Sequence, residues 1–85
     1  MADPLPRIFF DTNEGSHADG YELCLPVSLV DLAALGDQLR EGLEVIIYMP
    51  DELEMRAILN FDVERQVWIA HPIDGSIRYL DGSVA

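Results

Sequence analysis

The chain has 85 residues, sixteen of them acidic, against five arginines and no lysine, and its net charge is −11. A chain of this length has material for one small core, so we expect a single domain over residues 1–85, and its 49% hydrophobic content is that of a folding sequence. Such a charge excludes nucleic acids and anionic membranes as favoured partners, because both are bound through lysine and arginine, and it favours basic proteins.

The opening stretch MADPLPRIFF has no basic leader followed by a long apolar run, so the sequence predicts neither a signal peptide nor a membrane anchor. One cysteine cannot form an internal disulfide, which agrees with a reducing compartment. The sequence therefore predicts a cytoplasmic protein. The complete replacement of lysine by arginine further suggests a GC-rich bacterial genome.

The first quarter of the chain predicts two short strands separated by a loop. Residues 1–6 contain two prolines and predict an extended lead-in. Residues 7–10 predict a strand, and residues 11–20, all turn formers and acids, predict an exposed loop. Residues 21–25 alternate and predict a second strand that Pro26 ends.

One helix is predicted next, over about residues 29–41. Ser28 stands three residues before Asp31, which is the spacing of a capping box at a helix start. Gly36 weakens the helix and is expected to divide it, and Gly42 is expected to stop it. The predicted core-facing stripe has helical spacing and consists of Leu29, Leu32, Leu35 and Leu39.

The second half predicts four consecutive strands, at 45–49, 53–61, 67–70 and 77–80, followed by a frayed tail at 81–85. Pro50 suits a type I turn and Asp74-Gly75 a tight hairpin turn. One helix before a four-strand meander predicts an α+β fold. The arrangement resembles an SH3-like small antiparallel β-barrel or a strongly curved sheet; an open antiparallel sheet with the helix across one face is the alternative.

Loop length decides which side chains share a face of this meander. A three-residue loop at 50–52 pairs Met49 with Leu53, and an odd loop at 62–66 pairs Phe61 with Val67. An even loop would instead turn Trp68 inward. With odd loops, four apolar side chains emerge on the face opposite the core: Ile46, Tyr48, Ile58 and Trp68.

This outer patch has two interpretations. Either the N-terminal strands at 8–10 and 21–25 fold over it or the curvature of a small barrel covers it, or it is an interface for a partner protein or a second copy. In the second case Trp68 and Tyr48 are the expected anchors, because tryptophan and tyrosine are enriched at binding hot spots.

No catalytic constellation emerges from the remaining reactive residues. His71 with a nearby acid is the strongest catalytic candidate, although an ordinary half-buried histidine is the simpler expectation. Cys24, between two leucines, is expected to be buried and inert, and His17 to be solvated.

Metal and cofactor motifs are also weak. Asp11, Asn13 and Glu22 match positions of a calcium loop, but Gly15 and Ser16 break the pattern, so no metal site is predicted. Four aromatic residues among the acids would also permit a cage for a methylated cation: Tyr21, Tyr48, Trp68 and Tyr79. Ordinary packing in the core and the outer patch is the better explanation for them. No cofactor is predicted.

Three functions stay open. The first is a non-catalytic interaction or regulatory module, able to self-associate through the outer patch. The second is an acidic inhibitor or nucleic-acid mimic that binds a basic partner. The third is a small enzyme that uses His71 and would require a deep pocket.

Overall fold

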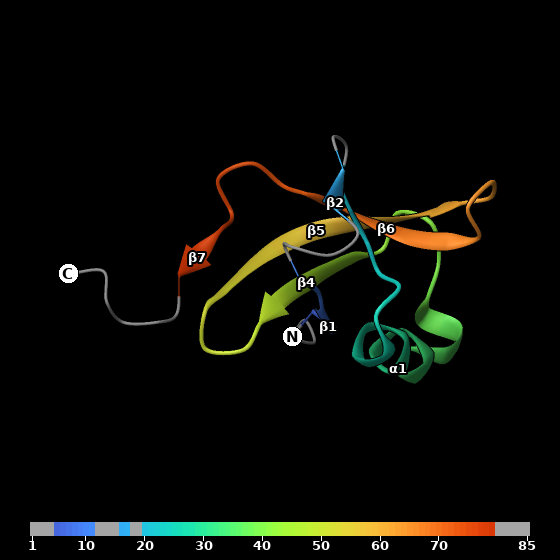
Figure 1. The fold of residues 1–85 in the computed structure, drawn as a ribbon, viewed down its shortest axis with the longest axis horizontal. Coiled ribbons are helices and arrows are strands. Elements are labelled where there is room, and N and C mark those ends of the chain that lie inside the picture. The colour runs from blue at the N-terminus through green and yellow to red at the C-terminus, as the bar shows by residue number, and fades with distance from the viewer. Residues whose placement is uncertain (1–4, 12–15, 18–19, 80–85) are drawn as a thin grey trace.

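The computed structural model describes residues 5–11, 16–17 and 20–79, which form one α-helix and a mixed β-sheet. The predicted α+β class is therefore confirmed. Figure 1 shows long, twisted strands with the helix on one side. The elements in chain order are β1 (Arg7–Phe9), β2 (Ser16–His17), β3 (Gly20–Glu22), α1 (Pro26–Ala34), the 3-10 helix η1 (Gly36–Gln38), β4 (Glu44–Met49), β5 (Leu53–Asp62), β6 (Val67–Pro72) and β7 (Arg78–Tyr79).

The sheet is built around the predicted antiparallel meander of β4, β5 and β6. Its strand order is β1-β4-β5-β6-β3-β2, with β1 parallel to β4 and β3 antiparallel to β6. The two N-terminal strands therefore extend opposite sides of the meander, and the predicted cover of the outer patch by this pair is wrong. β7 pairs with β5 rather than β6, so the fourth strand does not continue the meander.

No pairing within the described part of the chain joins β1 to β2, so the sheet is open there and not a closed barrel. The pairing of β1 with β4 also makes the sheet mixed rather than purely antiparallel. β2 lies within the predicted loop at 11–20, where it forms a two-residue pairing with β3.

One of the two predicted loop lengths is confirmed. Met49 pairs with Leu53 across a three-residue loop, in which Asp51 has a φ of 61°. The second loop is even, because β5 runs on through Asp62 and pairs that residue with Val67. Asp62 also builds the turn, since its carboxylate accepts from the Arg65 amide and its carbonyl from the Gln66 amide.

The helix starts earlier than predicted, at Pro26, a residue favoured in the first turn because the missing amide hydrogen has no helical partner there. Its N-cap is Leu25, and no side chain caps it, so the predicted capping box is wrong. Gly36, with a φ of +54°, separates α1 from η1, and the predicted division of the helix is confirmed.

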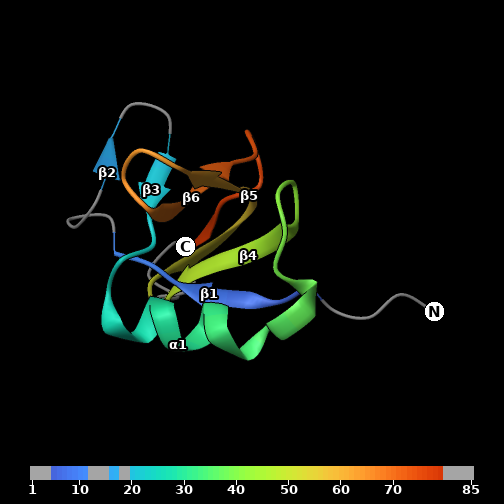
Figure 2. The same cartoon turned by 90° about the vertical axis from the view of Figure 1, so that its right-hand side faces the viewer.

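Ser28 and Asp31 bind the edge of the sheet instead of the helix end. The amide of Phe9 donates to the Asp31 carboxylate at 2.9 Å, and the Ser28 hydroxyl donates to the Phe9 carbonyl. Both groups of Phe9 point away from β4, which bonds to β1 through neighbouring residues. α1 therefore runs along β1 and covers the edge strand (Figure 2), which blocks pairing with another chain there.

The core lies on the face that α1 covers. Leu32 is buried there, with Leu35 and Leu39 packed against the same cluster, whereas Leu29 from the predicted stripe points outward. The rest of the buried cluster comes from the strands and from the residues that directly follow β1 and β3: Ile8, Phe10, Leu23, Val45, Ile47, Met55, Ala57, Leu59 and Ala70.

Candidate functional site

The structure does not bring the four predicted patch residues together. Ile46 and Tyr48 on β4 and Ile58 on β5 lie half-buried on the face opposite the core, here called the outer face. Trp68 pairs with Phe61, with ring centroids 5.3 Å apart, and packs against the core cluster. The predicted placement of Trp68 beside Ile58 is therefore wrong, because the even turn reverses the faces of β6. Ile58 lies opposite His71 instead.

Ion pairs span the outer face between its apolar side chains. Arg7 lies 3.0 Å from Glu54, Arg78 lies 3.5 Å from the same carboxylate, and Arg56 lies 3.1 Å from Glu44. Arginine side chains can cover apolar neighbours with their aliphatic stems while the charged ends stay hydrated. The outer face therefore has charged cover of its own, which weakens the case for it as a docking surface.

Tyr48 is held within this charged setting. Its hydroxyl donates to the Asp31 carboxylate at 3.4 Å, the Arg7 guanidinium lies 4.9 Å from its ring centroid, and Phe9 packs edge-on against the ring. Burial raises the pKa of Tyr48 above 10.0; the Asp31 charge and hydrogen bond raise it further, and Arg7 opposes the change. These contacts fix the phenol to α1 and make it a structural group.

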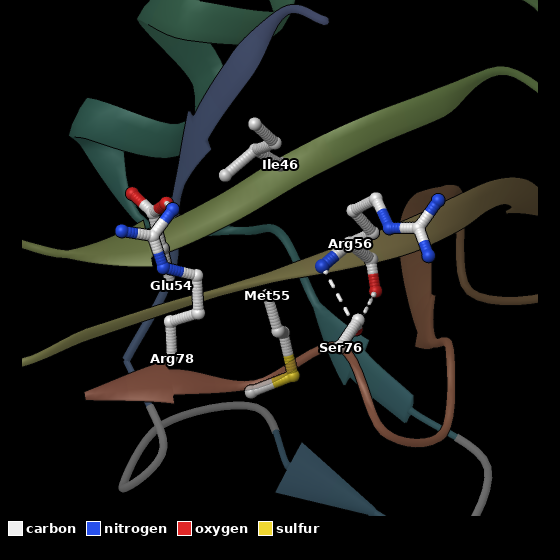
Figure 3. Close-up of a pocket in the computed structure, with 6 residues that line it drawn as sticks. All are labelled: Ile46, Glu54, Met55, Arg56, Ser76 and Arg78. Carbon is white, nitrogen blue, oxygen red and sulfur yellow. Dashed lines mark hydrogen bonds and ion pairs between the residues drawn. The ribbon is translucent and has the colours of Figure 1, made fainter.

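A hollow of about 250 Å³ opens beside β5, at the point where β6 has left it and β7 has joined. Figure 3 shows Met55 at its centre, Glu54 with Arg78 on one side, and Arg56 with Ser76 on the other. Ser76 accepts from the Arg56 amide at 3.0 Å and donates to the Ile73 carbonyl at 2.6 Å. Because these polar groups already have partners, the hollow serves as a junction between strands and offers no unmet group to a ligand.

The outward face of α1 is apolar, unlike that of an ordinary surface helix. Val27, Leu29 and Val30 are 50%, 51% and 68% exposed, and Ala33 and Ala34 beside them are also exposed. Surface helices normally carry charged or polar residues on this side. We call these five residues the α1 surface. Sequence reasoning missed it because the helical spacing of the leucines placed Leu29 on the predicted core-facing stripe.

A groove of about 300 Å³ adjoins the α1 surface through Leu29, which belongs to both. Its apolar lining comes from Leu23, Leu29, Val67 and Trp68. The groove is lined by the chain between β3 and α1, by α1 itself, and by the β5–β6 turn with the start of β6. Figure 1 shows the chain running from the sheet down to α1. Its polar lining consists of Gln66, the exposed Cys24 and the ion pair of Arg65 with Glu22.

Cys24 is therefore not buried, contrary to the prediction. The amide of Leu23 donates to the Trp68 carbonyl and extends the pairing of β3 with β6, which directs Leu23 into the core and its neighbour outward. The alternation of a strand outweighs the general tendency of cysteine to be buried.

In the part of the chain that the structure describes, the catalytic and metal candidates are not gathered into a site. His71 is half-buried, as expected, and neither the hollow nor the groove is lined by it. Asn13, Gly15 and Ser16 of the partial calcium pattern lie outside the described residues or have no described side chain. Within the described residues, no group of three or more histidine, cysteine or acidic side chains could hold a metal ion.

Helix length and hydropathy give one further result: no helix in the described part of the chain could cross a membrane. Comparisons with known proteins found no match to a family model, to a curated protein or to a solved structure.

Proposed function

We propose that this protein is a non-catalytic protein-interaction module and that its partner docks on the α1 surface. The observation that carries the proposal is the exposure of three large apolar side chains on one short helix: Val27, Leu29 and Val30. Since full burial of such a side chain is worth about 1.5–3 kcal/mol, covering the exposed half of all three would contribute roughly 3–5 kcal/mol to binding. That is a substantial part of the free energy of a micromolar complex.

The charge pattern of α1 supports this use. Asp31 is the single charged residue of Pro26–Ala34, and it is turned to the sheet, where it binds Phe9 and Tyr48. The outward positions thus carry no charge on a chain with a net charge of −11. An uncharged apolar patch within a charged surface is typical of an interaction site.

The helix is also held in place before any partner arrives. Its bonds to β1 and the packing of Leu32 fix its position on the sheet. A pre-ordered surface loses little conformational entropy on binding, so more of the burial energy remains as affinity.

The test is capture of the partner from the natural host with two matched variants. Val30→Asp places a charge on the α1 surface, and Ile77→Asp places one at an exposed apolar residue next to β7. We expect both variants to fold, the first to lose the partners that the wild type captures, and the second to retain them. Equal capture by all three proteins would refute the proposal.

An acidic inhibitor or nucleic-acid mimic is the second candidate. Arg7, Arg56, Arg65 and Arg78 are each paired with a glutamate, and the five arginines of the chain are too few to offset its sixteen acids. A partner held by carboxylates alone would be released steeply by salt, and Val30→Asp would not weaken it. The capture experiment, repeated at raised salt, separates the two functions.

We also propose a distant SH3-like architecture and a cytoplasmic location. The antiparallel β4–β5–β6 meander supports the first, and an experimental structure whose strands superpose on no SH3-like barrel would count against it. The single cysteine, exposed and free, supports a reducing compartment. Fractionation of the host cells tests the location.

A further inference from the structure

We propose that the groove beside α1 receives apolar side chains of a cationic, amphipathic segment of the partner protein. The basic residues of that segment would meet the carboxylates on the elements around the groove. This inference rests on the proposed function and adds to it the chemistry of the partner and the place where it is anchored.

The groove is suited in size and lining to one or two apolar side chains. Its volume of about 300 Å³ lies at the lower end of ligand-binding pockets. Trp68 forms part of its wall and is half-buried, with one side on Phe61 and the core. A tryptophan that packs on the core with one side and is accessible on the other is the kind of residue that anchors interfaces.

The groove and the α1 surface form one continuous apolar site, because Leu29 lines the first and belongs to the second. α1 has nine residues and hence a length of about 13 Å. A partner segment of two or three helical turns would cover this length and could place a side chain beside Trp68.

Charge decides between a basic partner and a second copy of this chain. The elements that carry the site, residues 20–42 and 61–68, contain six acidic residues and two arginines. Asp37 on η1 and Glu64 in the β5–β6 turn are exposed, and these two carboxylates carry the attraction, because Glu22 at the groove itself is paired with Arg65. A second copy would bring the same acids against them and be repelled, whereas a basic segment would be attracted.

Two single-copy residues report directly on the groove. Trp68 is the only tryptophan and Cys24 the only cysteine of the chain, and both line it. The fluorescence of Trp68 and the rate at which the neutral reagent N-ethylmaleimide alkylates Cys24 therefore both measure occupancy of the groove, and neither needs an added fluorophore.

The probe is a short helical peptide of leucine and lysine, compared with one in which glutamate replaces lysine and one in which serine replaces leucine. We expect only the leucine–lysine peptide to shift Trp68 emission and to slow Cys24 alkylation several-fold. Raising the salt from about 50 to about 500 mM should weaken that binding at least tenfold, since the attraction is screened.

Variants of the protein separate groove binding from general attraction to an acidic surface. Leu29→Asp and Val30→Asp should each lower the affinity for the leucine–lysine peptide at least tenfold, and Ile77→Asp should leave this affinity unchanged. Equal binding to all variants, no protection of Cys24, or tighter binding at high salt would each overturn the inference. If Val30→Asp loses the native partner while the leucine–lysine peptide leaves Trp68 and Cys24 unaffected, the proposed function stands and this inference fails.

Discussion

Removal of the Asp31 carboxylate should loosen the helix from the sheet. Asp31→Ala deletes the acceptor of the Phe9 amide at 2.9 Å and of the Tyr48 hydroxyl at 3.4 Å. A hydrogen bond to a charged group contributes about 1.5–3 kcal/mol, and the longer bond from the phenol adds little. We therefore expect the free energy of unfolding to fall by about 2–3 kcal/mol, from a total on the order of 4–12 kcal/mol for a chain of this length.

The assay is urea unfolding followed by far-ultraviolet circular dichroism. With an m-value of about 1–3 kcal/mol per molar urea, the midpoint should fall by about 1–3 M. Asp37→Ala is the matched control, because Asp37 is exposed on η1. Its free energy of unfolding should change by under about 0.5 kcal/mol. Equal midpoints for the two variants would refute the role assigned to Asp31.

A double-mutant cycle with Ser28→Ala extends the test. Ser28 and Asp31 bind the carbonyl and the amide of the same residue, Phe9. Loss of one bond should free the edge strand enough to weaken the other, so the double variant should lose less stability than the two single losses added together. We expect a coupling of about 0.5–2 kcal/mol, and strict additivity would show that the two bonds act independently.

Three further outcomes are expected. Gly20→Ala should lower the thermal midpoint by about 4–20 °C, because its Cβ would lie 2.4 Å from the Ala70 carbonyl oxygen; an unchanged midpoint in calorimetry would contradict this close approach. The raised pKa of Tyr48 contributes stability that is fully present below about pH 10 and is lost as pH rises through that pKa. Above about pH 10 the free energy of unfolding of the wild type should therefore fall relative to that of Tyr48→Phe, and parallel stability–pH curves would count against this. Trp68→Ala should cost about 2–3 kcal/mol in urea unfolding, whereas an outward-facing indole would cost under about 0.5 kcal/mol.

The elements of the second half could be predicted closely because each depends on local pattern. The expected strand at 45–49 is found at Glu44–Met49, and the three-residue loop after it gives the expected pairing of Val45 with Ala57. Alternation fixes such a register when the loop length is known, since a one-residue slip would expose every core residue.

The β5–β6 register failed because alternation does not say where a strand ends. Asp62 was assigned to the loop as a turn former, yet it pairs in the strand and builds the turn with the same peptide. An aspartate whose carboxylate can accept from the backbone amide three residues later is a signal for such a turn. Had this signal been used, the loop would have been predicted to contain four residues, 63–66. That single residue moved Trp68 from the outer face to the core side.

The candidate site was missed for a different reason: Leu29 was assigned to the core-facing leucine stripe, and Ser28 and Asp31 were assigned to a helix cap. A serine three residues before an acid is typical of a helix start, and the same spacing also puts both side chains on one helix face. In this protein they bind β1, which is distant in sequence, and Leu29 is turned to solvent. No local pattern could reveal that contact, because it depends on where the edge strand lies.

The pairing of the first strands with the last part of the sheet has a consequence for synthesis on the ribosome. β1 pairs with residues 46–48, and β3, apart from its short pairing with β2, pairs with residues 69–70, so neither can join the central strands until those strands have emerged. High contact order of this kind slows folding, because long loops must close before the contacts form. Apart from the short β2–β3 pairing, the N-terminal half should therefore remain without sheet partners until the C-terminal half is made, and a nascent chain stalled near residue 50 should be readily cut by protease.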